Sequence, residues 1–406
     1  MKVLMLGWEF PPYKSGGLGT ACYDLAKGLA SQGVTITFVM PFAPDGAEAD
    51  FVKLVGANTL VDSITIRTVS SLLTPYMDPE SYARRHALGG HDANELYGKN
   101  MAIELARYGL AVEKIVAEEN FDIIHAHDWM TYEAGIRARE LSGKPLVVHL
   151  HATESDRTAG NPNLWIAHRE YEGLQAADRV IANSHWTKNN ILKEYALIPE
   201  KICVVHWGIT QDNPNYTMNY TSSLNAKDKL VLSLGRVTVQ KGIDYLVHAA
   251  RIVADHIANV KFIIVGKGDK LNDTIRLVSD LGLTDKFIFA GWLNGSDVHR
   301  AFQMADVFVM PSVSEPFGLV ALESLKNKTP IIISKQSGAS EVVKNALKVD
   351  FWDVHELANK IIALLSHDSL REELRENGYK ESCTFDLETP ARKCIDIYHD
   401  VLGADT

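Results

Sequence analysis

The stretch Met-Pro-Ser-Val-Ser-Glu-Pro-Phe-Gly-Leu-Val-Ala-Leu-Glu, residues Met310–Glu323, decides the fold that we expect for this chain. The apolar run that leads into it, Val307–Met310, has the length and composition of a buried strand. Pro311 cannot donate a hydrogen bond to a neighbouring strand, so we expect the strand to end there. From Leu319 onward the apolar spacing is that of a helix. The stretch is therefore predicted to be strand, turn and helix.

A ligand site is expected at the start of this predicted helix. The first backbone N–H groups of a helix have no partner within it and suit an anionic or hydroxyl-rich ligand. Glu315 lies in the turn after the strand, and Glu323 lies on the helix, facing the same side. We therefore expect one carboxylate at the mouth of the sheet and a second one deeper. A capped surface helix with incidental acids is the alternative.

Length and composition restrict the class of protein. A chain of 406 residues is too long for one ordinary core, and 46% hydrophobic with 23% charged residues is typical of a soluble globular protein. A net charge of -10 argues against nucleic acid as the main partner. The four cysteines are widely spaced, and no apolar run has the length of an export signal or a membrane span. We therefore expect two domains, reduced thiols and a cytoplasmic location, with no integral membrane segment.

The beginning of the chain predicts a Rossmann-type unit. Lys2–Leu6 and Val34–Met40 have the composition of strands, and residues 18–32 have helical periodicity. Ligands of such units lie at the carboxyl ends of the strands. The intervening Gly-Gly-Leu-Gly, residues 16–19, lacks the glycine spacing of a dinucleotide fingerprint, but paired glycines let a backbone approach a ligand closely. A flexible turn without a ligand is the alternative.

Two further strands end in polar side chains. The strand Asp122–His125 leads into His-Ala-His-Asp-Trp, where Asp128 is a candidate acceptor of a hydrogen bond from a sugar hydroxyl. The apolar strand Pro145–Leu150 leads to His151, which we expect over the cleft. A metal site at His125, His127 and Asp128 ranks lower, because side chains alternate along a strand and no further ligands follow.

Three polar residues, Thr153, Glu154 and Arg157, come directly after this strand exit. They are candidates for contact with an acceptor. The alternative is that they cap a helix start and pair with one another, which residues of these types at this spacing commonly do.

The second half repeats the strand–loop–helix pattern after a polar linker at 211–227. Strand Lys229–Leu234 leads into a loop that carries Arg236 and Lys241. An arginine can bind phosphate bidentately and a lysine acts as a point charge, so the pair suits a diphosphate and could stabilise it as a leaving group. A solvated basic loop is the alternative. The next strand, Val260–Val265, ends in small residues against which a nucleobase could lie.

These motifs resemble those of retaining nucleotide-sugar glycosyltransferases with two Rossmann-like domains, the GT-B type that includes glycogen and sucrose-phosphate synthases. The resemblance rests on Glu-x-Phe-Gly-Leu…Glu, Arg-x-x-x-x-Lys-Gly, Gly-Gly-Leu-Gly and His-Asp-Trp, and it covers nearly the whole chain. It implies an α/β fold in which two parallel sheets face each other across a cleft. The implied domains are an acceptor-side domain at 1–212, a nucleotide-sugar-binding domain at 213–385, and a C-terminal helix at 386–406 that crosses back to the first domain.

The resemblance also implies a role for each motif. The catalytic residues would be His151, Arg236, Lys241 and Glu315. The donor-binding residues, with Glu323 on the ribose hydroxyls, would be Gly16, Gly17, Gly19, Gly266, Gly268, Phe317, Gly318, Leu319, Val320 and Glu323. The residues at the acceptor or the sugar would be Asp128, Thr153, Glu154 and Arg157. No Asp-x-Asp pair follows a strand, so we expect a metal-independent enzyme without a cofactor, whose substrate is the nucleoside-diphosphate sugar.

The activity that we expect is retaining transfer of a hexose, in the first instance glucose, from a UDP-, ADP- or GDP-sugar to an acceptor hydroxyl. Gly-Gly-Leu-Gly and His-Asp-Trp favour elongation of an α-glucan, as in a glycogen synthase. Within the family, Glu323 favours the broad branch with lipid, protein or small-molecule acceptors. A nucleotide-sugar epimerase and a non-catalytic sugar-binding protein are further alternatives, and a nicotinamide oxidoreductase is disfavoured by the glycine spacing. Donor base, sugar, acceptor, oligomeric state and the route to retention stay open.

Overall fold

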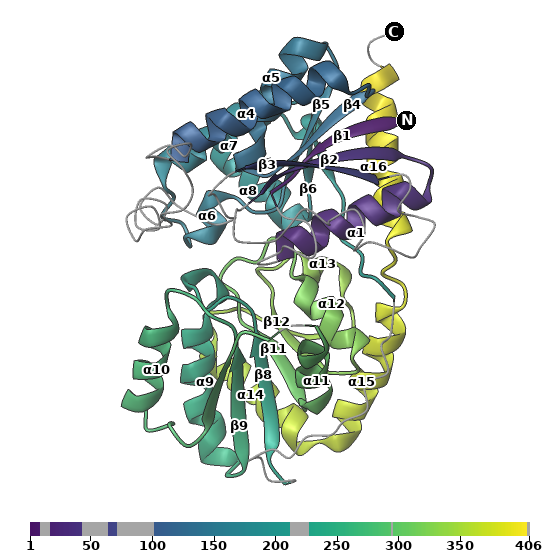
Figure 1. Ribbon diagram of the computed structural model, residues 1–406. Coiled ribbons are helices and arrows are strands. Elements are labelled where there is room, and N and C mark those ends of the chain that lie inside the picture. The colour runs from purple at the N-terminus through teal and green to yellow at the C-terminus, as the bar shows by residue number, and fades with distance from the viewer. Residues whose placement is uncertain (9–16, 43–63, 71–100, 212–226, 294, 404–406) are drawn as a thin grey trace.

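Two sheets of parallel strands, each covered by helices, make up the protein (Figure 1). The computed structural model describes residues 1–8, 17–42, 64–70, 101–211, 227–293 and 295–403. Most of the predicted linker, residues 212–226, and Gly16 of the predicted donor loop lie outside the described residues. The first sheet is built from residues 2–204 and the second from residues 229–349.

The first sheet has the strand order β3-β2-β1-β4-β5-β6-β7. Its strands are β1 (Lys2–Leu6), β2 (Thr35–Phe42), β3 (Ile64–Ser70), β4 (Ile123–His127), β5 (Leu146–Leu150), β6 (Arg179–Ala182) and β7 (Ile202–Val204). Its helices are α1 (Gly17–Ser31), α4 (Met101–Glu118), α5 (Trp129–Ser142), α6 (Glu154–Arg157), α7 (Leu164–Ala176), α8 (His185–Tyr195) and the 3₁₀ turn η2 (Pro199–Lys201).

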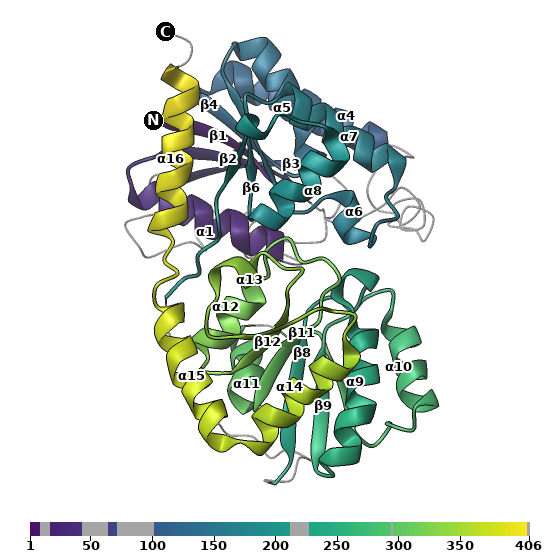
Figure 2. The same ribbon diagram turned by 180° about the vertical axis from the view of Figure 1, so that it is seen from behind.

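The central strands of this sheet are buried on both sides because helices cover both faces. In β5 every residue from Leu146 to Leu150 is buried. Helices α4, α5 and α7 pack side by side over one face, while α1 and α16 cover the other (Figures 1 and 2). The side chains of β4 alternate accordingly: Ala126 lies next to Gly135 of α5, whereas His125 contacts Tyr398 of α16.

The second sheet has the strand order β10-β9-β8-β11-β12-β13. Its strands are β8 (Lys229–Leu234), β9 (Val260–Val265), β10 (Phe287–Gly291), β11 (Val307–Met310), β12 (Ile331–Ser334) and β13 (Leu347–Val349). Its helices are the 3₁₀ turn η3 (Val239–Lys241), α9 (Ile243–His256), α10 (Leu271–Asp280), α11 (Ser296–Met304), α12 (Leu319–Lys326), α13 (Ala339–Val342), α14 (Val354–Ser366) and α15 (Asp368–Ser382).

The last helix, α16 (Glu388–Gly403), leaves the second domain and lies against the first (Figure 2). It packs on α1, where a Cβ at Gly28 would lie 2.4 Å from the carbonyl oxygen of Leu387. The hydroxyl of Tyr398 lies 2.6 Å from Nδ1 of His125 in β4. The chain thus passes twice between the domains, and its C-terminal helix completes the core of the first.

Polar contacts hold the two domains together beside the cleft. The carboxylate of Glu341, in α13, accepts hydrogen bonds from the backbone N–H groups of His185 and Trp186 at the start of α8, at 2.9 and 2.6 Å. His206 lies 2.8 Å from the same carboxylate. The carboxylate thus caps the amino-terminal end of a helix in the other domain, which carries positive partial charge. Within the described part of the chain, no helix is long and apolar enough to cross a membrane.

Candidate active site

A cavity of about 700 Å³ lies between the domains, where the strands of both sheets have their carboxyl ends. The first domain lines it with the start of α1, the residues that follow β5 and the segment after β7. The second lines it with the loops after β8, β9, β10 and β11 and with the first turns of α12. The predicted site residues in its wall are Gly17, His151, Arg236, Lys241, Gly266, Glu315, Phe317, Gly318, Leu319, Val320 and Glu323.

A cation and a carboxylate from two separate loops meet in this wall. Nζ of Lys241, after β8, lies 2.6 Å from Oε2 of Glu315, after β11, and the Ser312 hydroxyl donates to the same oxygen at 2.9 Å. The Glu315 side chain is buried, whereas that of Lys241 retains a fifth of its exposure. Arg236, from the same loop as Lys241, donates to the Gln240 side chain at 3.4 Å. The cavity wall therefore holds a carboxylate that is paired with one cation, and a second cation, Arg236, lines the same cavity.

Helix α12 points its amino-terminal end at the cavity, and glycine at position 318 is required for this turn. Gly318 has a φ of +98°, and a Cβ there would lie 2.9 Å from Cε of Met310. The following residues, Leu319 and Val320, line the cavity with the first turn of the helix. The first-turn amides of a helix bind phosphate well because no intrahelical acceptor is available to them.

The glycines after β9 let two strand-end loops pack together. A Cβ at Gly266, whose φ is +141°, would lie 1.8 Å from the carbonyl oxygen of Gly235, and one at Gly268 would lie 2.1 Å from that of Val237. Gly266 lines the cavity, but Gly268 and Gly19 are not in its wall. These glycines pack against the loop that carries Arg236 and so help to fix it. This packing role was not predicted; the contact with a nucleobase stays a prediction.

Four buried histidines form a row on the face of the first sheet that α1 and α16 cover. His125 and His127 lie on β4, and His149 and His151 lie on or directly after β5. The rings within each pair stack, with centroids 4.3 and 4.5 Å apart. Of the four, only His151 lines the cavity, and Trp207 stacks on it at 5.2 Å.

Burial lowers the pKa of all four histidines. The pKa of His127 falls to about 3, and for His151 the neighbouring His127, His125 and Arg157 lower the pKa further. Both imidazoles are therefore neutral near pH 7, and Nδ1 of His127 lies 2.9 Å from Nε2 of His151. A neutral imidazole can hydrogen-bond a sugar hydroxyl but brings no charge to the site.

Asp128 lies behind His151 rather than in the cavity wall. Its Oδ1 accepts a hydrogen bond from the backbone N–H of His151 at 2.8 Å, and its Oδ2 lies 3.5 Å from Arg157. Its backbone has a φ of +61°, which is uncommon for a residue other than glycine. Burial raises the pKa of Asp128, while Arg157 and the backbone hydrogen bonds oppose that shift. These contacts make Asp128 a positioning residue for the segment that carries His151.

Thr153, Glu154 and Arg157 are also not among the residues that line the cavity. Thr153 caps α6 through a reciprocal pair of hydrogen bonds with Asp156. Arg157 lies 2.8 Å from Glu170 in α7 and 3.5 Å from Glu154, and it donates to the carbonyl of Ala152 at 2.7 Å. Their contacts are those of the capping-and-pairing alternative, so the predicted acceptor contact has no support in this arrangement.

Several cavity-lining residues were not predicted from the sequence. Asn183 follows β6 and donates to the carbonyl of His151 at 2.9 Å, so its place at a strand end was the signal that could have identified it. Trp207 also follows a strand, β7, but its stacking on two histidines could not be read from the sequence. The other unpredicted polar or aromatic residues in the wall are Thr20, Gln240, Trp292, His299 and Phe302.

Comparison with known proteins places this geometry in a family. The family model for Glycosyltransferase Family 4 matches residues 15–213, and the model for Glycosyl transferases group 1 matches residues 220–381. An uncharacterized glycosyltransferase of Methanocaldococcus jannaschii is 27% identical over 98% of both chains. A glycogen synthase of Mycobacterium tuberculosis is 26% identical over 98% of this chain and 94% of its own.

Solved structures show the same fold. Sucrose-phosphate synthase from Thermosynechococcus elongatus superposes with a TM-score of 0.76 over 99% of both chains, at 20% identity. An Anabaena protein in complex with UDP-glucose superposes with a TM-score of 0.69, at 20% identity, over 98% of this chain and all of that one. The predicted fold class is confirmed. Two consecutive family models span most of the chain and the fold agrees with both, so the chain belongs to the group 1 glycosyltransferases of the GT-B architecture.

Proposed function

We propose that this glycosyltransferase moves a hexose, glucose in the leading case, from a nucleoside-diphosphate sugar to an acceptor hydroxyl with retention of the anomeric configuration. The observation that carries the proposal is the convergence of Arg236, Lys241, Glu315 and the start of α12 on one cavity between the domains. Cations beside a helix amino terminus suit a diphosphate, and a fixed carboxylate beside them suits a hydroxyl-rich sugar.

The leaving diphosphate is the group on which negative charge grows during transfer. Arg236 and Lys241 would bind its oxygens, and the first-turn amides of α12 would donate to it. Because these donors are fixed before the reaction, they stabilise the developing charge without reorganisation. Glu323, which also lines the cavity, would hold the ribose hydroxyls.

The hexose would lie between the second domain and His151. The neutral imidazole of His151 would bind a sugar hydroxyl, and the backbone contacts of Asp128 and Asn183 would keep it in place. Glu315 would accept hydrogen bonds from the sugar while its charge is balanced by Lys241.

Retention requires either two displacements or an attack on the face from which the phosphate leaves. In the described part of the cavity wall the carboxylates are Glu315 and Glu323, and both belong to the second domain together with the two cations. This distribution favours attack on the leaving-group face, assisted by the departing phosphate. No step of this route calls for a metal ion or a cofactor.

An α-glucan is the leading acceptor. Similarity to a glycogen synthase over nearly the whole chain supports it, together with the Gly-Gly-Leu-Gly and His-Asp-Trp motifs. The presence of Glu323 in the cavity favours the second candidate, transfer to a lipid, protein or small-molecule acceptor, because the resemblance described above associates this glutamate with the broad branch of the family.

The test is an incubation with UDP-, ADP- or GDP-glucose, with and without glycogen, that measures nucleotide release and glucan growth. We expect release that depends on acceptor and is abolished in Glu315→Ala. Lys267→Ala, which removes an exposed cation from the neighbouring loop, is the matched control and should retain activity. Acceptor-dependent release that persists in chelator would support metal independence. No release above the Glu315→Ala level with any donor and glycogen would refute the glucan proposal.

A further inference from the structure

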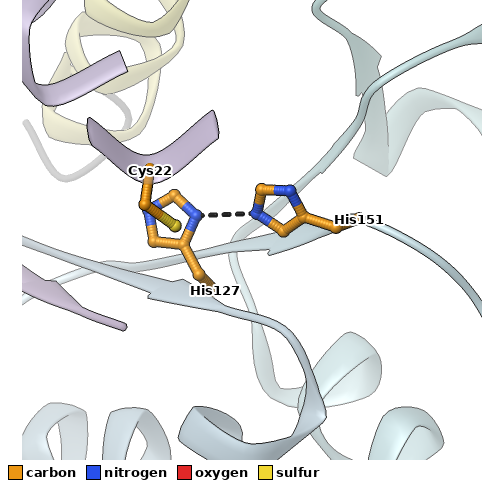
Figure 3. Close-up of side chains that lie close together, drawn as sticks. All are labelled: Cys22, His127 and His151. Carbon is orange, nitrogen blue, oxygen red and sulfur yellow. Dashed lines mark hydrogen bonds between the residues drawn. The ribbon is translucent and has the colours of Figure 1, made fainter. Parts of the chain in front are cut away.

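Three side chains with metal-binding atoms lie close together (Figure 3), and one of them, His151, lines the cavity. Cys22 comes from α1, His127 from the end of β4 and His151 from the residue after β5. One donor atom of each lies within 4.8 Å of the donor atoms of the other two, and all three residues are buried. The glucosyl-transfer proposal uses only His151 of these three, so the cluster needs a separate account.

A thiolate and two imidazoles are a donor set for Zn²⁺ and similar ions. In a tetrahedral zinc site with bond lengths of about 2.0–2.3 Å, neighbouring donor atoms lie roughly 3.3–3.7 Å apart. Nδ1 of His127 and Nε2 of His151 are already 2.9 Å apart, so they need to separate only slightly. The donor atoms of the trio, the Cys22 sulfur included, lie within 4.8 Å of one another, so the sulfur would have to move only a short way to bind the same ion.

Buried nitrogen atoms without hydrogen-bond partners lie in the same row of histidines. Among the described residues, Nε2 of His127 has no hydrogen-bond partner, and the same holds for Nε2 of His125 and both ring nitrogens of His149. Buried polar atoms are rarely left in this state. An ion on Nδ1 of His127 and Nε2 of His151 would not pair these atoms, so the case for the site rests on the geometry of its three donor atoms.

A second trio, His125, His127 and His149, also has donor atoms within 4.8 Å of one another. The cysteine trio is favoured for two reasons. It contains a thiolate, the stronger ligand for zinc, and its His151 lines the cavity, as do Thr20 and Ala21 next to Cys22. An ion can therefore reach it from the cleft.

We propose that Cys22, His127 and His151 form a binding site for a thiophilic divalent ion such as Zn²⁺, with the fourth coordination position open to the cavity. The thiol proton is released on binding, and the ion replaces the hydrogen bond between the two imidazoles. In its consequence the inference rests on the proposed function. Binding the ion separates the two imidazoles and so shifts the His151 ring from the position in which it would bind the sugar, and zinc therefore inhibits transfer.

Binding is tested without any enzyme assay. Chelator-treated protein is titrated with Co²⁺ and followed by absorption, and Zn²⁺ affinity is measured by competition with a chelating dye. We expect one ion per chain and a thiolate-to-cobalt charge-transfer band. Cys22→Ser and Cys22→Ala should both lose the band and weaken zinc binding by more than the roughly 10–100-fold that loss of an outer-shell partner costs. His127→Asn should weaken it similarly.

Cys394→Ser is the matched control, because Cys394 is a fully buried thiol on α16 outside the cluster. It should keep the band and the affinity, and thermal melting should show that all variants are folded. The proposal would be overturned if folded Cys22→Ser bound zinc as tightly as the parent protein does. It would also be overturned if the parent protein bound no ion at excess zinc.

The inhibition arm separates this inference from the glucosyl-transfer proposal. Zinc should inhibit transfer by the parent protein, chelator should restore it, and Cys22→Ser should transfer sugar with the inhibition lost. Transfer that is unaffected at saturating zinc would overturn the inhibitory consequence. If no donor gives transfer, the cobalt and dye measurements still decide whether the site binds metal.

Discussion

Lys241 and Glu315 are 74 residues apart in the sequence, yet their side chains form an ion pair of 2.6 Å in the wall of the cavity. They meet because both follow parallel strands, β8 and β11, that are neighbours in the sheet. Ser312 donates a second hydrogen bond to the same carboxylate oxygen. A bound diphosphate would therefore compete with Glu315 for the Lys241 ammonium. Binding of the donor would in this way affect the position of the Glu315 carboxylate.

Removing the Lys241 ammonium should damage catalysis more than stability. Lys241→Met keeps most of the stem but removes the charge, and kcat/KM should fall by roughly 10²–10³-fold, the usual effect of losing one transition-state donor. The free energy of unfolding should fall by about 1–3 kcal/mol, because the buried Glu315 carboxylate loses one of its partners. Nucleotide release and urea unfolding measure the two effects.

The double variant Lys241→Met/Glu315→Gln separates the two roles of the pair. It should regain most of the lost stability, because no buried charge is left unpaired, but none of the activity. Lys267→Met is the control and should change neither quantity. Recovery of activity in the double variant would contradict a direct role for the ammonium.

The sequence predicted which residues lie at the strand ends, but not the contacts among the residues that lie outside the cavity wall. Arg236, Lys241, Glu315 and His151 follow strands of parallel sheets, and such strands bring their carboxyl ends to one edge. The place of Arg157 depends instead on Glu170, whose helix is fixed only by tertiary packing. Spacing alone could not decide between contact with an acceptor and an internal ion pair, and the same holds for Asp128.

Arg157 should prove to be a stability residue. It is the cation beside three buried carboxyl groups, those of Asp128, Glu154 and Glu170. Arg157→Met removes the guanidinium from these three buried carboxyl groups and should lower the free energy of unfolding by roughly 3–5 kcal/mol. Urea unfolding checks this, with Arg179→Met as the control. Normal stability with a raised KM for the acceptor would instead support the sequence-based prediction.

Glu341 should control how tightly the domains close. Burial by itself would raise the pKa of this carboxyl, but hydrogen bonds from His206 and from the backbone of His185 and Trp186 outweigh it and lower the pKa. Glu341→Ala removes these contacts across the cleft. We expect a larger radius of gyration in solution scattering and a higher KM for the donor, with both domains still folded.

The same opening should occur as pH falls, because a carboxyl with a lowered native pKa contributes its stabilisation above its unfolded value and loses it on protonation. Glu381→Ala, which removes a carboxylate bound to backbone N–H groups within the second domain, is the control. An unchanged radius in Glu341→Ala would show that other contacts set the closure.

Glu170 should make the chain less stable as pH rises through the range from about 4.5 to 7. Burial raises its pKa from 4.5 to about 7, although Arg157 and the Tyr195 hydroxyl act in the opposite direction. Between these values the native state holds a proton that the unfolded chain has lost, so stability attributable to this group is present at low pH and decreases with increasing pH. The size of the effect is on the order of 2–3 kcal/mol.

Comparison with Glu170→Gln isolates this one group from the other ionisable groups of the chain. The amide has no proton to lose, so the difference in free energy of unfolding between parent and variant should change by that amount between pH 4.5 and pH 8, in favour of the variant at high pH. Urea unfolding at several pH values measures it, with the half-exposed Glu172→Gln as the control. A difference that is constant with pH would mean that Arg157 keeps Glu170 ionised throughout, and the cation rather than burial would then dominate this network.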